Sequence, residues 1–189
     1  MATNNEKPQT TITPERMVFR IVVKGTKDAV WREITKTDEL QATMFNMRLH
    51  TPALEPGQPL QMRTANGKYT GVVGVIEEVD KPNRFVHTLR FTGGDDPACR
   101  ITYELRDVEG GVEFTLIVDD YEAGTKAEKS LTRGGPMIVG TLKRGVETGR
   151  PSLGVRAFYA VFRAIEPLTP KKMKSERWPM DASSVEKQS

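Results

Sequence analysis

The feature that most constrains this fold is a series of short apolar stretches separated by tight turns between residues 46 and 119. The intervening segments 65–67, 80–83, 93–97 and 109–111 are rich in Gly, Pro, Asn and Asp, which are typical of turns. Parallel strands need crossover connections of about a dozen residues or more, so turns this short predict an antiparallel meander. Six stretches are the candidate strands: FNMRLHT, PLQMRT, KYTGVVGVIEEV, RFVHTLRF, CRITYELRDV and GVEFTLIVDDY.

Apolar and polar residues alternate along the later stretches, so the predicted sheet has two different faces. The neighbours of the apolar positions are mainly polar, among them Thr88, Arg90 and Thr102. One face is therefore expected to be apolar and to need a cover, while the other faces water. The positions on the apolar face are Phe85, His87, Leu89, Phe91, Ile101, Tyr103, Leu105, Val112, Phe114, Leu116 and Val118.

The segment RGGPMIVGTLKRGVETGRP, residues 133–151, predicts the long helix that covers this face. On a helical wheel Leu131, Ile138, Leu142 and Val146 fall on one stripe. Gly135, Gly140 and Gly145 lie in the helix interior, where each costs roughly 1 kcal/mol relative to alanine. Gly135 and Gly145 indicate either close contact between helix and sheet or the wall of a cavity, and the sequence leaves both interpretations open. Gly140 points the other way and is expected to lie against the segment after Gly149.

The N-terminal part supplies a strand and two short helices. MVFRIVV, residues 17–23, predicts a strand, and a break at residues 24–26 follows it. Thr26 is placed to cap a helix, and residues 37–39 look like a second capping point before Leu40 and Met44. The predicted order is β-α-α-β(5 or 6)-α, an α+β fold with about six or seven antiparallel strands.

Two segments lie outside this pattern. Residues 1–15 are polar and are expected to form a flexible lead-in to a domain spanning residues 16–150. Residues 151–189 predict an amphipathic helix followed by a basic tail. This helix could pack on its own domain, form a homodimer or touch an anionic membrane; packing on its own or a partner domain is favoured because the tail is short. The apolar positions that would form a dimer interface are Val155, Phe158, Tyr159, Phe162 and Ile165.

Composition narrows the classes of partner. Lys and Arg number 28 against 25 acids, spread along the chain, which gives no support for nucleic-acid binding. The one cysteine, Cys99, excludes an internal disulfide and fits a reducing compartment. No signal peptide and no apolar run of about 18 residues is found, so we expect a cytoplasmic protein without integral membrane contact. Two distant histidines and no Cys pair predict no metal site and no cofactor.

Four stretches together resemble START-like (SRPBCC, helix-grip) domains, in the branch of heat-shock-chaperone ATPase-activator homologues. They are DAVWREIT, GVVGVIEEVDKPNRFVHTLRF, CRITYELRDVEGGVEFTLI and GGPMIVGTLKRGVETG, and the resemblance covers about residues 16–150. It implies a curved antiparallel sheet gripping a long helix, with a hydrophobic cavity between them. Such domains bind lipids, sterols or polyketides, some convert them, and some serve as co-chaperones. Pro136 and Met137 stand where the family usually has a tryptophan, and Pro136 is expected in the first helical turn.

His87 and Tyr103 are the candidate catalytic residues. An imidazole among apolar side chains prefers neutrality and could act as acid or base near neutral pH, or simply hydrogen-bond a ligand oxygen, although a purely structural role is the stronger interpretation. The predicted function is binding of a hydrophobic small molecule, with acid–base conversion open; the alternative is a non-enzymatic protein-interaction module. The candidate ligand-binding residues are Trp31, Phe45, Met47, Met62, Phe85, His87, Leu89, Phe91, Tyr103, Leu105, Phe114, Leu116, Met137, Ile138 and Leu142.

Overall fold

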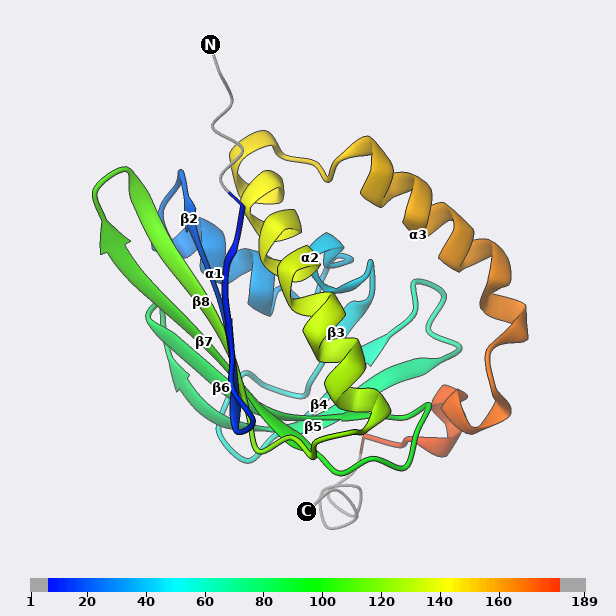
Figure 1. Cartoon of the computed structure of the whole chain (residues 1–189). Coiled ribbons are helices and arrows are strands. Elements are labelled where there is room, and N and C mark those ends of the chain that lie inside the picture. Colours follow the sequence, from blue (N-terminus) through cyan, green and yellow to red (C-terminus); the bar gives the residue numbers. More distant parts are fainter. Residues whose placement is uncertain (1–6, 181–189) are drawn as a thin grey trace.

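A computed structural model of the chain describes residues 7–180. Its centre is an open antiparallel sheet of eight strands in the order β1-β2-β8-β7-β6-β5-β4-β3 (Figure 1). The α+β helix-grip architecture expected from the sequence is confirmed, with eight strands instead of six or seven. The strands are β1 Gln9–Ile12, β2 Arg16–Val23, β3 Arg48–His50, β4 Pro59–Arg63, β5 Thr70–Asp80, β6 Arg84–Phe91, β7 Cys99–Val108 and β8 Gly111–Asp119.

The helices follow from local capping signals. Thr26 caps the first and Thr125 caps the long one, each side chain accepting a hydrogen bond from a backbone N–H three residues on. Ser152 caps the last helix in the same way. The helices are α1 Lys27–Thr35, α2 Lys126–Thr148 and α3 Leu153–Ile165, with short 3-10 turns η1 Ala42–Met44, η2 Glu166–Leu168, η3 Lys171–Met173 and η4 Ser175–Arg177.

The predicted alternation of the sheet is confirmed. Inward-facing positions join one hydrophobic core with α1 and α2, and α2 crosses the inner face of the sheet (Figure 1). The largest fully buried side chains include Phe19, Phe85 and Phe114, one from each of three strands. Outward positions such as Glu104 and Arg106 stay polar and pair with charged neighbours on the same face. One face of the sheet therefore carries the core.

Two local predictions are wrong in detail. Residues 9–12, placed in the lead-in, form β1, which pairs with β2 in antiparallel register. The second predicted helix is reduced to the three-residue turn η1, which ends at Phe45 in a left-handed backbone conformation. The strand forms because an edge position beside β2 was free to pair, and that is a tertiary effect.

The long helix begins earlier than predicted, at Lys126. Thr125 Oγ1 accepts from Glu128 N at 3.1 Å, and Glu128 Oε2 accepts from Gly124 N at 2.7 Å. Thr125 and Glu128 have the spacing of a capping box, with Glu128 reaching back to Gly124, the residue before the cap. Pro136 consequently lies in the helix interior and not in the first turn, where it removes one intrahelical hydrogen bond. The helix continues through it because burial of its apolar face stabilises it more than intrinsic propensity does.

The glycines of α2 differ in whether they contact the sheet. A Cβ at Gly135 would lie 2.4 Å from the Phe19 ring, so this glycine marks close contact between α2 and β2. A Cβ at Gly140 would have no atom within 4 Å, and one at Gly145 would only reach Glu33 at 4.0 Å. Gly140 therefore does not lie against the segment after Gly149. Close packing holds at Gly135.

The C-terminal extension runs back along the domain from the end of α2 (Figure 1). The predicted amphipathic helix forms α3, and Tyr159 anchors it by donating its hydroxyl hydrogen to the carbonyl of Ala42. The segment after α3 reaches the outer face of β4 and β5, where Gln61 Nε2 donates to Trp178 O at 2.9 Å. Within residues 7–180, none of the helices is long and apolar enough to span a membrane.

Candidate ligand-binding site

Five aromatic rings meet on the inner face where β6, β7 and β8 face α1. His87 lies 5.3 Å from Phe85 and 5.7 Å from Tyr103, measured between ring centroids. Tyr103 stacks on both Phe85 and Phe114 at 6.0 and 5.8 Å, and Trp31 meets Phe85 edge to face at 6.1 Å. The sequence placed His87 and Tyr103 on one face, and the structure brings them into one cluster.

The tautomer of His87 follows from one hydrogen bond. Nδ1 lies 2.8 Å from the carbonyl oxygen of Thr88, which can only accept, so Nδ1 carries the hydrogen. Nε2 is then left as an acceptor, and no partner for it is found among residues 7–180. Burial lowers the pKa of His87 to about 4, so the imidazole is neutral at neutral pH. His87 thus offers one unused acceptor inside an apolar cluster.

Tyr103 offers the complementary donor. Its hydroxyl lies 4.0 Å from Met44 Sδ, a weak acceptor. Burial raises the pKa of Tyr103 well above its ordinary value, so the hydroxyl stays protonated. A ligand oxygen beside the pair could accept from Tyr103, while a ligand hydroxyl could donate to His87 Nε2.

Several apolar side chains around this pair are only half-buried, in contrast with the core behind them. Leu89 and Phe91 continue the inner face of β6 beyond His87, and Ile138 comes from α2. We call these residues, with Met44 and Met47 from the η1 loop, the apolar rim. Flexible methionines suit a surface that adapts to an apolar ligand. The rim therefore forms a less buried margin of the core that holds the His87–Tyr103 pair.

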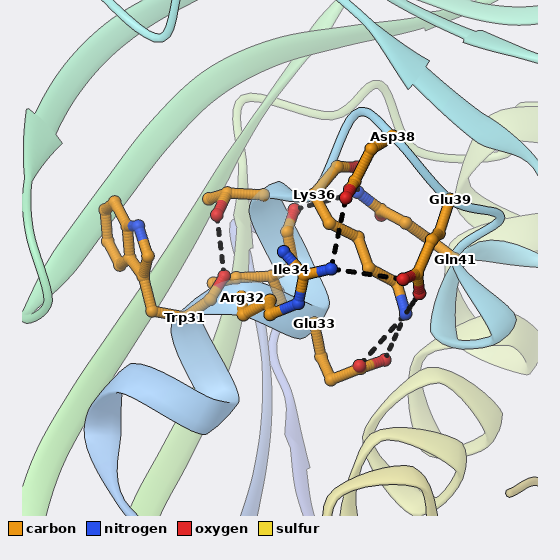
Figure 2. A network of polar contacts seen from close by, with 9 residues as sticks. Trp31, Arg32, Glu33, Ile34, Lys36, Asp38, Glu39 and Gln41 are labelled. Carbon is orange, nitrogen blue, oxygen red and sulfur yellow. Dashed lines mark hydrogen bonds and ion pairs between the residues drawn. The ribbon is translucent and has the colours of Figure 1, made fainter. Parts of the chain in front are cut away.

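The η1 loop is held in place by Gln41, which is buried (Figure 2). Gln41 Nε2 donates to the carbonyls of Ile34 and Lys36 at 3.3 and 2.8 Å, satisfying acceptors at the end of α1. Gln41 N donates to Met47 O at 2.7 Å and closes the loop. This is why the loop presents Met44 and Met47 to the sheet.

A charged network surrounds that turn on the outside (Figure 2). Lys36 pairs with Glu33 at 2.9 Å and with Glu39 at 3.4 Å, and its side chain is 8% exposed. Arg32 reaches Asp38 and Glu39, each at 3.1 Å. The hydrogen bond with Arg32 lowers the pKa of Asp38. These contacts fix the turn between α1 and η1, with Arg32, Asp38 and Glu39 facing solvent and Lys36 enclosed between its two carboxylate partners.

The other predicted ligand-binding residues fall into two groups. Phe45 and Met137 are half-buried outside the core cluster, and Phe45 lies beside Gly134 of α2. The second group is almost fully buried and packs together as core. Its members are Trp31, Met62, Phe85, Leu105, Phe114, Leu116 and Leu142.

Sequence reasoning missed Met44 as a neighbour of Tyr103 and Val139 as a fully buried residue of α2. Met44 could not be placed because its position depends on the left-handed turn at Phe45 and Asn46. Val139 lies one residue from the predicted stripe, and a wider apolar arc on the wheel would have included it.

The cysteine and the acidic residues at the end of β8 have structural contacts and do not join the His87–Tyr103 pair. Burial raises the pKa of Cys99 to about 12, and its thiol lies 3.5 Å from Leu89 O, so it is not poised as a nucleophile. Asp119 and Asp120 pair with Arg16 and Arg100, away from the His87–Tyr103 pair. No group of three or more His, Cys, Asp or Glu that could hold a metal occurs in the described part of the chain.

A shallow hollow of about 70 Å³ lies on the sheet near β1 and β2, far too small for a drug-sized ligand. Its lining is Lys7, Gln9, Arg20, Ile21, Val22 and Glu113. It is unrelated to the His87–Tyr103 pair.

Comparisons with known proteins agree with this fold. DynU16, a protein of the dynemicin biosynthetic locus, is 20% identical with a TM-score of 0.57; the match covers 74% of this chain and 49% of DynU16. This chain thus spans about half of DynU16. An HSP90 activator from Plasmodium falciparum is 14% identical with a TM-score of 0.58, over 72% of this chain and 98% of that one.

The Aha1 dimer from Colwellia psychrerythraea, studied in solution, is 14% identical with a TM-score of 0.57, over 71% of this chain and 97% of that one. At these identities the structures show the fold alone. No match was found among curated proteins. The family described as activator of Hsp90 ATPase homolog 1-like protein matches residues 24–147, which include α1, the meander and nearly all of α2. The chain therefore belongs to the activator of Hsp90 ATPase homologue 1-like family.

Proposed function

We propose that the chain binds a hydrophobic small molecule of the lipid, sterol or polyketide class between the inner face of the sheet and α2. The observation that carries this is the unused acceptor of His87 beside the Tyr103 hydroxyl, buried among aromatic rings and continuous with the apolar rim. A ligand hydroxyl would supply the donor that His87 Nε2 lacks among the described residues, and a ligand oxygen would accept from the Tyr103 hydroxyl. DynU16, which shares this fold, comes from a biosynthetic locus, and this agrees with a small-molecule ligand.

The pair favours binding over proton transfer. With a pKa of about 4, the imidazole of His87 is a weak base at neutral pH, although it remains a good hydrogen-bond acceptor. An acid–base conversion of the ligand would use His87 Nε2 as the base and Tyr103 as the donor to the ligand oxygen. We propose orientation of the ligand as the main role of both residues, in a cytoplasmic protein.

Titration with Nile red, a neutral apolar dye with a carbonyl oxygen, tests the proposal. We expect saturable binding, a weaker affinity in Leu89→Trp, which fills the space beside the pair, and an unchanged affinity in Leu168→Ser, which removes a leucine that is 83% exposed. Native mass spectrometry of the purified chain would reveal a co-purified lipid. Absent binding, or binding sensitive to Leu168→Ser and not to Leu89→Trp, would contradict the proposal.

The variant His87→Asn tests the polar contact and should weaken binding of the dye. The matched variant His50→Asn changes the other histidine, on the outer side of β3, and should leave the dye affinity unchanged. Full turnover of an identified substrate by His87→Asn would dispose of a catalytic role. Equal affinities in the two variants would show that His87 has only a structural role.

A second candidate function is a protein-interaction module that forms a homodimer through α3. Phe158 and Phe162 lie 4.9 Å apart between ring centroids and are 39% and 51% exposed, and Ile165 is 47% exposed. Tyr159, predicted as part of this interface, is turned toward its own domain instead. The dimer of the Colwellia Aha1 protein makes homodimerisation reasonable for this chain.

Light scattering across a concentration series tests this candidate. We expect a dimer that is lost in the double variant Phe158→Ser, Phe162→Ser and kept in Leu153→Ser, since Leu153 is exposed on the opposite side of α3. A monomer at all concentrations would eliminate the α3 dimer.

A further inference from the structure

The outer face of the sheet distributes its charges unevenly. On strands β2, β8, β7 and the adjoining part of β6, arginines form ion pairs with acidic residues of the same face or of neighbouring turns. This ladder neutralises the positive charge on that part of the face. The pairs are Arg16–Asp119, Arg20–Glu113, Arg84–Glu104, Arg100–Glu77 and Arg106–Glu113.

The β3–β6 end of the same face is different. Arg48, Arg63 and Arg90 alternate with core-facing residues and so point outward, and none of them pairs with an acid among residues 7–180. Strands β3 and β4 contain no acidic residue at all. Glu176, on the described part of the tail, pairs with Lys174 at 3.4 Å. Three permanent cations therefore share one surface without a described counter-charge.

Strand pairing brings the three arginines together. Arg48 and Arg63 are direct partners across β3 and β4, where side chains of one face lie about 5 Å apart. Arg63 Nε donates to Gln61 Oε1 at 3.0 Å, and Gln61 pairs with Val73, which pairs with Arg90. Two strand spacings, about 10 Å, separate β4 from β6, a gap that two long side chains can close.

The tail segment forms one wall of this arginine cluster. Gln61 Nε2 donates to Trp178 O at 2.9 Å, and the guanidinium carbon of Arg90 lies 5.5 Å from the centre of the Trp178 ring. Trp178 is itself fixed by donating from Nε1 to Lys172 O at 2.9 Å. The cation–π contact orients Arg90 without neutralising its charge.

Two guanidinium donors in the cluster lack acceptors. The Nε atoms of Arg48 and Arg90 are buried, and neither has a hydrogen-bond partner among residues 7–180. A buried charged donor without an acceptor is costly, and an anion at this position would supply the missing acceptor. The pKa of His50 is lowered, first by burial and then by the positive charges of Arg63 and Arg48. The contribution of the two arginines is expected where positive charge is not compensated.

We propose that Arg48, Arg63 and Arg90 form a binding site for a phosphate group, on the sheet face opposite the proposed apolar site. Guanidinium groups present a planar fork of donors that matches phosphate oxygens, and the phosphate dianion offsets more of this charge than a carboxylate does. The phosphate belongs to a small-molecule phosphate ester or to free phosphate. The site is independent of the hydrophobic ligand between sheet and α2.

His50 serves as the reporter, because the chain has only two histidines and His87→Asn assigns their NMR signals. Inorganic phosphate is titrated into the full chain at fixed pH, with acetate at equal ionic strength as the comparison. We expect a saturable shift of the His50 signal with phosphate and a rise of its pKa, because the bound anion compensates the arginines. A phosphate monoester in a parallel titration distinguishes an ester ligand from free phosphate, by which of the two binds more tightly.

The triple variant Arg48→Gln, Arg63→Gln, Arg90→Gln should lower the phosphate affinity by about tenfold or more. The matched control Arg106→Gln removes a cation that is paired with Glu113 on the same face and should bind like the wild type. If the triple variant is unfolded by circular dichroism, Arg48→Lys and Arg63→Lys keep the charge, lose the fork and should weaken binding.

Three results would overturn the proposal. The first is a His50 signal that does not respond to phosphate or responds equally to acetate. The second is equal phosphate affinity in the arginine variants and in Arg106→Gln. The third is phosphate binding that emerges only when Asp181 and Glu186 of the tail are changed to amides, because the chain's own carboxylates would then occupy the cluster.

Discussion

Replacing Gly135 by alanine should destabilise the fold, against the usual effect of this substitution in a helix. The added Cβ would lie 2.4 Å from Phe19, and an ordinary contact needs at least 3.4 Å, so the ring must move by about 1 Å. Phe19 is fully buried between β2 and α2 and has no free space to enter. Overpacking of this kind costs about 1–3 kcal/mol. Alanine returns about 1 kcal/mol of helix propensity, which leaves a net loss of up to about 2 kcal/mol.

Gly140 of the same helix provides the matched control. A Cβ there meets nothing within 4 Å, so Gly140→Ala gains propensity without a clash and should stabilise by about 0.5–1 kcal/mol. Urea unfolding followed by circular dichroism measures both. With a slope of about 2 kcal/mol per molar urea, the two midpoints should differ by about 1 M, in opposite directions from the wild type.

The reasoning depends on a rigid contact between α2 and β2. If Gly135→Ala stabilised the protein as much as Gly140→Ala, Phe19 would have room to move and the close approach of helix and sheet would be refuted. A change in the slope of the Gly135→Ala curve would point instead to an altered native or denatured state, and an unchanged slope is therefore part of the expected result.

Three further perturbations test the site and the extension. The pKa of His87 is about 4 when folded and about 6.5 when unfolded, so this group should lower the free energy of unfolding by about 1.4 kcal/mol for each pH unit as the pH falls through this window. Urea midpoints measured across the window should lose this part of their pH dependence in His87→Asn and keep it in His50→Asn. Tyr159→Phe leaves the Ala42 carbonyl without its donor, so trypsin should cleave at Arg156 and Arg163 faster while the free energy of unfolding in urea changes by no more than about 1 kcal/mol; equal cleavage rates would contradict the anchor. Gln41→Ala frees the carbonyls of Ile34 and Lys36 and should cost about 2 kcal/mol in urea, whereas an unchanged midpoint would show that the η1 loop is held by packing alone.

The sheet could be predicted because period-two alternation and turn residues are local signals. The inward positions from Phe85 to Val118 and the turn glycines at Gly67 and Gly110, both with positive φ, required no knowledge of the tertiary structure. The pairing of His87 with Tyr103 in one cluster followed from the same alternation, since β6 and β7 are sequential and antiparallel.

The start of α2 was also encoded locally, in the Thr125–Glu128 capping box, and was passed over in favour of the glycine pair before Pro136. A proline normally marks a helix start or end, and here tertiary packing overrides that preference. The paths of residues 9–12 and of the segment after α3 could not be predicted, because they depend on sheet edges and outer-face positions that exist only in the folded state.

Strand β6 connects the two proposed sites. His87, Leu89 and Phe91 face inward to the aromatic cluster and the rim, while Arg90 between them faces outward to Trp178. A shift of one residue in its pairing would exchange these faces, burying a guanidinium in the apolar cluster and exposing His87. Burying an unpaired charge is far more costly than burying an imidazole that stays neutral. The opposed chemistry of neighbouring residues therefore fixes the register of β6, and the same alternation places the two proposed sites on opposite faces of one strand.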